Sequence, residues 1–238
     1  MKNNTYIAID LETTGLNPSS DKILEIGAAR IEEGRVTETY GTFINVGIPI
    51  PYFITNLTGI DDEMASGGKQ IREAMGELLD FCGDDVLLGH NILFDYSFLK
   101  QAAVNNSLKF ERHGIDTLKI ARKCLPQLPS RKLEYLCRYL SIETENQHRA
   151  LDDALAASEV YRKLAQRYYE QAPEVFEACP MVCRVKKECP ATKIQKGYLI
   201  DLIKYHRIDL DVPMDTLTKS EASRLIDKII LQHGRIKR

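Results

Sequence analysis

The order of strand-like and helix-like segments constrains the fold of this chain most strongly. Three apolar, partly β-branched segments come first, at residues 6–12, 23–31 and 36–46, and each has the length of a strand. Helical patterns and short strands then alternate, beginning with an amphipathic helix at residues 71–79 and a strand at residues 86–88. This order predicts an α/β fold in which a sheet of mixed direction is flanked by helices.

The alternation continues further along the chain. Apolar residues at helical spacing predict a helix at residues 94–104 and a long helix at residues 150–168. Asp116 stands between a strand-like and a helical segment, so we expect its side chain to cap that helix. We expect Pro49 and Pro51 to interrupt regular structure after the third strand.

Charge divides the chain into an acidic and a basic part. The net charge is −2, but residues 1–178 carry 19 basic and 27 acidic side chains, whereas residues 179–238 carry 13 and 7. Such asymmetry is typical of a segment that faces nucleic acid, and a solvated basic tail is the alternative. We predict a main domain at residues 1–172, a cysteine-containing linker at 173–190 and a small basic helical module at 191–238.

The apolar segments of the chain are too short for a membrane protein. No window of the sequence approaches the ~18 apolar residues that a membrane helix needs. The N-terminal residues also lack the apolar core of a signal peptide. We therefore expect a cytoplasmic protein without a membrane partner.

Three of the six cysteines lie close together in the sequence. Cys179, Cys183 and Cys189 have a C-x3-C-x5-C spacing, and three thiolates plus one further ligand suit a tetrahedral Zn²⁺ site. No fourth ligand is evident, since Cys137 and His206 could serve only if the fold brings them close. Buried or redox-inert thiols are the alternative to zinc.

Two carboxylates stand at the end of the first predicted strand. Side chains alternate along a strand, so Asp10 and Glu12 project from the same face. Burying the two carboxylates together is costly unless cations neutralise them, and paired oxygen ligands favour Mg²⁺ or Mn²⁺. The alternative is a pair of solvated acids at the start of a loop.

Further polar side chains with the chemistry of a catalytic site occur later in the chain. Asp95 opens the helix that follows the strand at residues 86–88, where it could also be a helix cap. Asp153 falls inside the long helix, and His148 precedes that helix in a polar stretch. Because the two are five residues apart, His148 can reach a common site only from the loop.

Three stretches together resemble the motifs of the DEDDh (DnaQ-like) family of 3′–5′ exonucleases. They are Asp10-Leu-Glu-Thr-Thr-Gly-Leu16, His90-Asn-Ile-Leu-Phe-Asp95 and His148-Arg-Ala-Leu-Asp-Asp153. The resemblance spans about residues 5–169, in order and at the family's spacing. The chain looks most like the exonuclease domain of PolC-type polymerases and its stand-alone relatives. The resemblance implies an RNase H-like fold.

The resemblance also implies roles for individual residues. Asp10, Glu12, Asp95 and Asp153 align with the carboxylates that bind two Mg²⁺ or Mn²⁺ ions, and His148 aligns with the general base. Asp153 is chosen over its neighbour because the family has four residues between the histidine and the aspartate. The positions that cradle the terminal nucleotide are matched by Thr13, Leu16, Leu57, Asn91 and Phe94.

The resemblance implies a function as well. We expect hydrolysis from the 3′ end of single-stranded DNA, with release of nucleoside 5′-monophosphates, in repair or proofreading. One alternative is a 3′–5′ exoribonuclease that trims RNA. Another is a polymerase-associated binding subunit with secondary nuclease activity, and a polymerase or a repair protein is the expected protein partner.

The basic C-terminal part has the pattern of two capped helices. Thr192-x-x-Gln195 and Thr218-x-x-Glu221 have capping-box spacing, and each precedes an apolar helical run. Cations that favour contact with phosphates follow: Lys193, Lys196, Lys204, Arg207, Lys219 and Arg224. We expect this module to hold nucleic acid, and a protein-docking module is the alternative.

Overall fold

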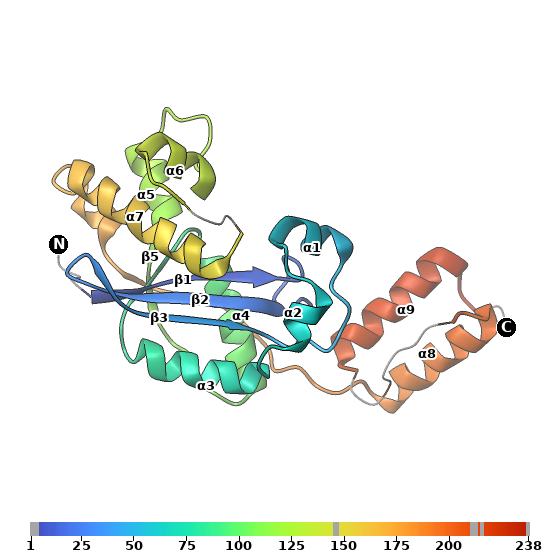
Figure 1. Cartoon of the computed structure of the whole chain (residues 1–238). Coiled ribbons are helices and arrows are strands. Elements are labelled where there is room, and N and C mark those ends of the chain that lie inside the picture. The colour runs from blue at the N-terminus through green and yellow to red at the C-terminus, as the bar shows by residue number, and fades with distance from the viewer. Residues whose placement is uncertain (1–4, 145–147, 210–213, 215–216, 237–238) are drawn as a thin grey trace. The chain divides into compact units, whose positions relative to one another are not determined.

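The chain forms two compact units, residues 1–185 and 186–238, in a computed structural model (Figure 1). The structure describes residues 5–144, 148–209, 214 and 217–236. The boundary between the units falls within the segment for which we predict a linker, so that segment is divided between them. Among the described residues, no helix combines the length and the apolar character needed to cross a membrane.

A mixed six-stranded sheet forms the centre of the first unit, in the order β3-β2-β1-β4-β5-β6. The strands are β1 (Thr5–Thr13), β2 (Ile23–Glu32), β3 (Arg35–Phe43), β4 (Leu87–Gly89), β5 (His113–Asp116) and β6 (Cys179–Pro180). The first three pair antiparallel, β1, β4 and β5 pair parallel, and β6 is antiparallel at the edge. The predicted mixed sheet is confirmed, whereas β6 was not expected.

Helices cover both faces of the sheet (Figure 1). One face carries α3 (Ile71–Cys82) and α4 (Leu93–Asn105), and the other carries α5 (Thr117–Cys124), α6 (Leu133–Leu140) and α7 (Ala150–Tyr168). The alternation along β1 separates the two cores. Its odd-numbered apolar residues pack toward α3 and α4, whereas Tyr6 and Ala8 pack toward α7.

Two short helices begin after the interruption that we expect at Pro49 and Pro51. They are α1 (Tyr52–Thr58) and α2 (Asp62–Ser66), and Pro51 occupies the position just before the first helical residue. The expected interruption is confirmed, since neither a helix nor a strand lies between Phe43 and Tyr52. A helix can start directly after Pro51 because proline lacks only a hydrogen-bond donor that the start of a helix leaves unpaired anyway. Buried Ile54 and Ile60 anchor this region in a small core of its own.

The end of the first unit packs against α7. A short 3₁₀ helix, η1 (Pro173–Phe176), places the Phe176 ring against Tyr161 and Tyr169, with centroid distances of 6.0 and 5.7 Å. Phe176 is buried in the core that α5, α6 and α7 form with the sheet. Residues 173–181 therefore contribute to the packing of the first unit.

The second unit contains α8 (Lys193–His206) and α9 (Lys219–His233). Both capping boxes are confirmed, since the hydroxyl of Thr192 accepts from the Gln195 backbone N–H and that of Thr218 from Glu221. The two helices share a small core that includes Leu199, Leu202, Ala222 and Ile229.

Candidate active site

The end of β1 presents Asp10 and Glu12 on the face that α7 covers. The two side chains continue the row of Tyr6 and Ala8, because residues two apart on a strand share a face. Both carboxylates are half-buried. The prediction that they project together is confirmed.

Asp95 reaches the same carboxylate cluster from the first turn of α4. Its side chain is only 3% exposed, and backbone N–H groups, including that of Leu11 on β1, hydrogen-bond to the carboxylate. These bonds oppose the rise in pKa that burial causes, but the pKa of Asp95 still lies well above its ordinary value. The helix start is thus joined to the end of β1.

His148 and Asp153 approach Glu12 from the start of α7. One ligand atom from each of Glu12, His148 and Asp153 can be chosen so that all three lie within 4.8 Å of one another. His148 precedes the helix, is exposed and has a positive φ of 62°, and its backbone N–H donates to Asp153 Oδ2 at 3.2 Å. His148 therefore reaches the site from the loop, as we predict from the spacing.

Burial and mutual repulsion raise the pKa values of the clustered carboxyl groups. Burial, followed by the charges of Asp95, Asp153 and Glu12, raises the pKa of Asp10 well above its ordinary value. Burial and the charge of Asp153 raise the pKa of Glu12 to about 7. Burial also raises the pKa of Asp153, against the opposing effect of His148. A divalent cation would offset this repulsion, and carboxylate oxygens are the donors that Mg²⁺ and Mn²⁺ prefer.

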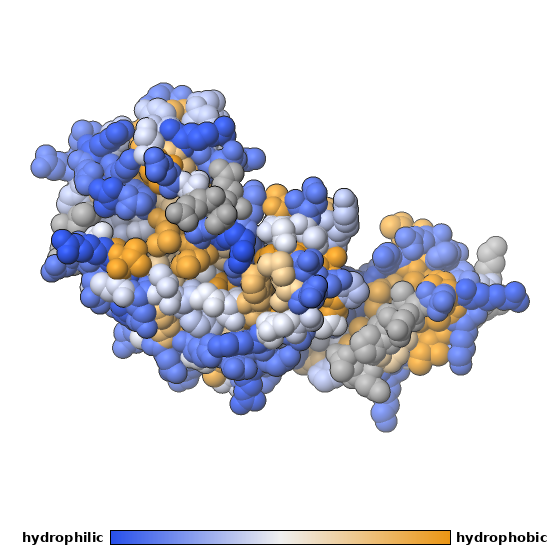
Figure 2. Space-filling view, in the orientation of Figure 1, coloured by the Kyte–Doolittle hydropathy of each residue, from blue (hydrophilic) through white to orange (hydrophobic). Residues whose placement is uncertain are grey.

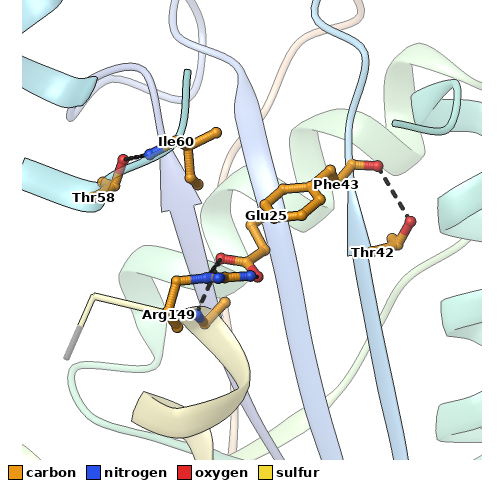
Figure 3. Close-up of polar contacts among 7 residues, drawn as sticks. Glu25, Thr42, Phe43, Thr58, Ile60 and Arg149 are labelled. Carbon is orange, nitrogen blue, oxygen red and sulfur yellow. Dashed lines mark hydrogen bonds and ion pairs between the residues drawn. The ribbon is translucent and has the colours of Figure 1, made fainter. Parts of the chain in front are cut away.

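Glu25 on β2 is a further residue of the site that the sequence analysis missed. It pairs directly with Glu12 across the sheet, is 6% exposed, and accepts a hydrogen bond from Arg149 Nη2 at 2.8 Å (Figure 3). It also accepts from the backbone N–H of Ala150, at the start of α7, at 3.3 Å. An acid within the run Ile23–Ala29, whose other residues are apolar or glycine, is the signal that could have found it.

The start of α7 lies directly on β2. A Cβ atom on Gly27 would stand 2.1 Å from the backbone nitrogen of Leu151, so only glycine allows this approach. The guanidinium of Arg149 lies 5.1 Å from the centre of the Phe43 ring on β3 (Figure 3). Arg149 is thus held on two sides, next to His148 in the chain.

The five residues predicted to bind the terminal nucleotide have different environments. Thr13 is buried and donates to the carbonyl of Gly15 at 2.7 Å, and Phe94 is half-buried against the core of α3 and α4. The other three side chains are accessible to solvent: Leu16 is 84% exposed, Leu57 is 55% exposed, and Asn91 is also exposed. Their role in substrate binding stays a prediction.

The three cysteines that cluster in the sequence have different surroundings in the structure. Cys179 lies on β6 and is exposed, Cys183 packs partly against the core of α3 and α4, and Cys189 is exposed in the second unit. Within the described ranges, no group of three or more possible ligands includes a cysteine. His206 instead hydrogen-bonds to the carbonyl of Gly234 at 3.0 Å. The zinc site stays a prediction without structural support.

The sequence and the fold match known exonucleases. The profile of the RNase_T exonuclease family matches residues 7–161. The DNA polymerase III PolC-type of Caldanaerobacter subterraneus is 38% identical over 165 residues, which is 69% of this chain and 12% of that polymerase. The DNA polymerase III subunit epsilon of Aquifex aeolicus is 34% identical over 166 residues, or 69% of this chain and 82% of the relative.

Solved structures of low sequence identity share the fold. E. coli exonuclease I in complex with a dT13 oligonucleotide has a TM-score of 0.65 and 21% identity, and the match covers 72% of this chain and 43% of that one. The match to the family profile covers more than half of the chain, and it includes the motifs that carry the clustered carboxylates. The chain therefore belongs to the RNase_T exonuclease family.

Proposed function

We propose that this chain is a metal-dependent 3′–5′ exonuclease that removes nucleoside 5′-monophosphates from single-stranded DNA. The observation that carries the proposal is the convergence of Glu12, His148 and Asp153, whose ligand atoms lie within 4.8 Å. Family membership supports a nuclease, and the similar exonuclease I was solved with a dT13 oligonucleotide. Proofreading or repair is the role that we infer for this activity.

Asp10, Glu12, Asp95 and Asp153 are the residues that would hold two Mg²⁺ or Mn²⁺ ions. The donor set fits, because all four groups are carboxylates whose pKa values are raised by burial and mutual repulsion. When bound, such ions stabilise charge on the phosphoryl oxygens and lower the pKa of a water molecule.

His148 is the residue that would accept the proton of the attacking water. Imidazole is the side chain that most often serves as a general base in proton transfer. The side chain is exposed, so the ring can pass the proton on to bulk water. The hydrogen bond between the His148 backbone and Asp153 keeps the base beside the carboxylates.

An end-labelled substrate tests the proposal directly. Single-stranded DNA, duplex DNA and RNA, each labelled at the 5′ end, are incubated with the wild type and with Asp10→Ala in Mg²⁺, Mn²⁺ or EDTA. We expect a ladder that shortens from the 3′ end of single-stranded DNA, requires the metal and disappears in the variant. Products unaffected by EDTA or by the substitution would overturn it, and faster degradation of RNA would favour the RNA-trimming alternative.

The relatives favour a polymerase as the protein partner. The match to the epsilon subunit covers 82% of that protein, whereas the chain matches only 12% of the PolC-type polymerase. We infer that the chain acts together with a polymerase. Co-purification with a polymerase tests this, and its absence together with rapid turnover by the isolated chain would contradict it.

A further inference from the structure

A basic groove, here called the Arg122 groove, lies between the β4–α4 turn, helix α5 and the loop that leads into α6. Its volume is about 630 Å³, which lies within the range of ligand-binding pockets. Polar and charged side chains dominate its lining, and none of the lining residues is acidic. Those that the argument uses are His90, Asn91, Arg122, Ser130, Arg131 and Lys132.

Two cations of the groove are available to a ligand. Arg122 and Lys132 are exposed, and neither side chain forms a hydrogen bond or an ion pair with any residue that the structure describes. The guanidinium of Arg131 is occupied, since it donates to the backbone carbonyls of Leu125 and Pro126. Unpaired cations in a concave surface without acids attract an anion.

The walls of the Arg122 groove are held in place without a ligand. The His90 ring contacts Thr117 Oγ1 and the carbonyl of Arg131, each at 2.8 Å, and so ties the loop to the ends of β4 and β5. The backbone N–H of Asn91 donates to Asp116 Oδ1 at 3.0 Å. Burial lowers the pKa of His90, so its ring is neutral near pH 7 and the cations supply the charge. A preformed site loses little entropy on binding.

The groove adjoins the carboxylate cluster. Asn91 lines it, and the carbonyl of Asn91 accepts from the backbone N–H of Phe94 at 2.8 Å, at the start of α4. Asn91 lies two residues before α4 and Asp95 lies in the first turn of that helix, so only a short stretch of chain connects the groove to the carboxylates. A strand whose last phosphate lies at the carboxylates would therefore bring its next phosphates near the groove.

We propose that the Arg122 groove binds the phosphodiester backbone of the single strand on the 5′ side of the bond that is cut, through Arg122 and Lys132. This inference rests on the proposed exonuclease function. It assigns the groove to the uncleaved part of the strand, so the groove contributes to affinity and leaves the chemistry at the carboxylates unchanged.

The test combines the substitutions Arg122→Ala and Lys132→Ala in the full chain. A matched control combines Lys109→Ala and Lys123→Ala, which remove the same charge from exposed side chains outside the groove. Binding of a fluorescent single-stranded oligonucleotide is measured in EDTA over a range of NaCl concentrations. Hydrolysis of the p-nitrophenyl ester of thymidine 5′-monophosphate, which has no upstream strand, is measured with Mg²⁺.

We expect the groove variant to bind the oligonucleotide on the order of tenfold more weakly than the wild type. The slope of log Kd against log salt should fall by about 1.4, because each lost phosphate contact on a single strand removes about 0.7. Its kcat and KM for the ester should match the wild type, and its melting temperature should be unchanged.

The proposal that the groove binds the strand would be overturned if the groove variant kept the wild-type slope of log Kd against log salt. An equal change of slope in the control variant would also overturn it. So would a parallel loss of activity on the ester, because the substitutions would then act on the catalytic site itself. If the wild type hydrolyses neither the ester nor the end-labelled single-stranded DNA, the exonuclease proposal fails. In that case the binding measurement in EDTA still decides whether the groove binds single-stranded DNA.

Discussion

Replacing Glu25 by glutamine tests whether the contact between β2 and the start of α7 positions His148. The substitution keeps the size of the side chain but removes the charge that pairs with Arg149. It also weakens the hydrogen bond to the backbone N–H of Ala150. Arg149 and Ala150 belong to the segment that carries His148 and Asp153. The substitution therefore acts on the site indirectly, by loosening the segment that holds these two residues.

The expected loss in the free energy of unfolding follows from how deeply Glu25 and Arg149 are buried. A hydrogen bond to a charged group contributes roughly 1.5–3 kcal/mol, and the side chain of Glu25 is only 8% exposed. The side chain of Arg149 is 39% exposed, so solvent screens part of the attraction and the lower end of the range applies. We expect Glu25→Gln to lower the free energy of unfolding by about 2 kcal/mol and Glu25→Ala by about 3 kcal/mol.

Activity should fall as well. Residues that hold a catalytic group in place change activity by about 10–100-fold when they are replaced. We expect a loss of this size in kcat for the p-nitrophenyl ester, with a smaller change in KM. Glu38→Gln is the matched control, because Glu38 pairs with Arg30 at 3.6 Å from an exposed position on the neighbouring strand. It should change stability by less than about 0.5 kcal/mol.

Urea unfolding followed by circular dichroism, together with steady-state kinetics, measures both effects. If Glu25→Gln and Glu38→Gln unfold at the same urea concentration with the same kcat, the reasoning is refuted. Lower stability with an unchanged kcat would leave Glu25 a structural residue only. Arg149→Lys retains the charge without the planar fork, so it should lose less activity than Arg149→Ala.

Three further predictions concern the carboxylates, the packing of α7 and the second unit. In the metal-free protein, the pKa of Glu12 is about 7, which exceeds the pKa of the same group in the unfolded chain. The contribution of Glu12 to stability is therefore complete at low pH and is lost as the pH rises through 7. The melting temperature in EDTA should therefore fall from about pH 5 to about pH 8, and Mg²⁺ should restore it; a flat profile would contradict this. Gly27→Ala should cost more than about 3 kcal/mol in urea unfolding, whereas Gly41→Ala, whose Cβ would meet nothing within 4 Å, should be tolerated. Deletion of residues 186–238 should leave the first unit folded but weaken binding of single-stranded DNA and its salt dependence, and unchanged affinity would remove the module from substrate binding.

Local features of the fold could be predicted from the sequence. The capping boxes at Thr192 and Thr218, the cap at Asp116 and the shared face of Asp10 and Glu12 are all present. Each depends on backbone geometry within a few residues, where spacing determines which groups meet. Helices α1 and α2 were missed because their burial against Leu24 on β2 depends on a segment distant in the sequence.

The family, the mixed sheet and the residues of the carboxylate cluster could all be predicted from the order and spacing of residues. Only the tertiary structure revealed Glu25, which meets Arg149 across 124 positions of the chain, and the groove around Arg122 and Lys132. It also assigned Cys179 and Cys189 to different compact units, although a short spacing groups them in the sequence. Periodicity describes which face of an element is apolar. The packing of the whole chain decides which faces and helix ends come together.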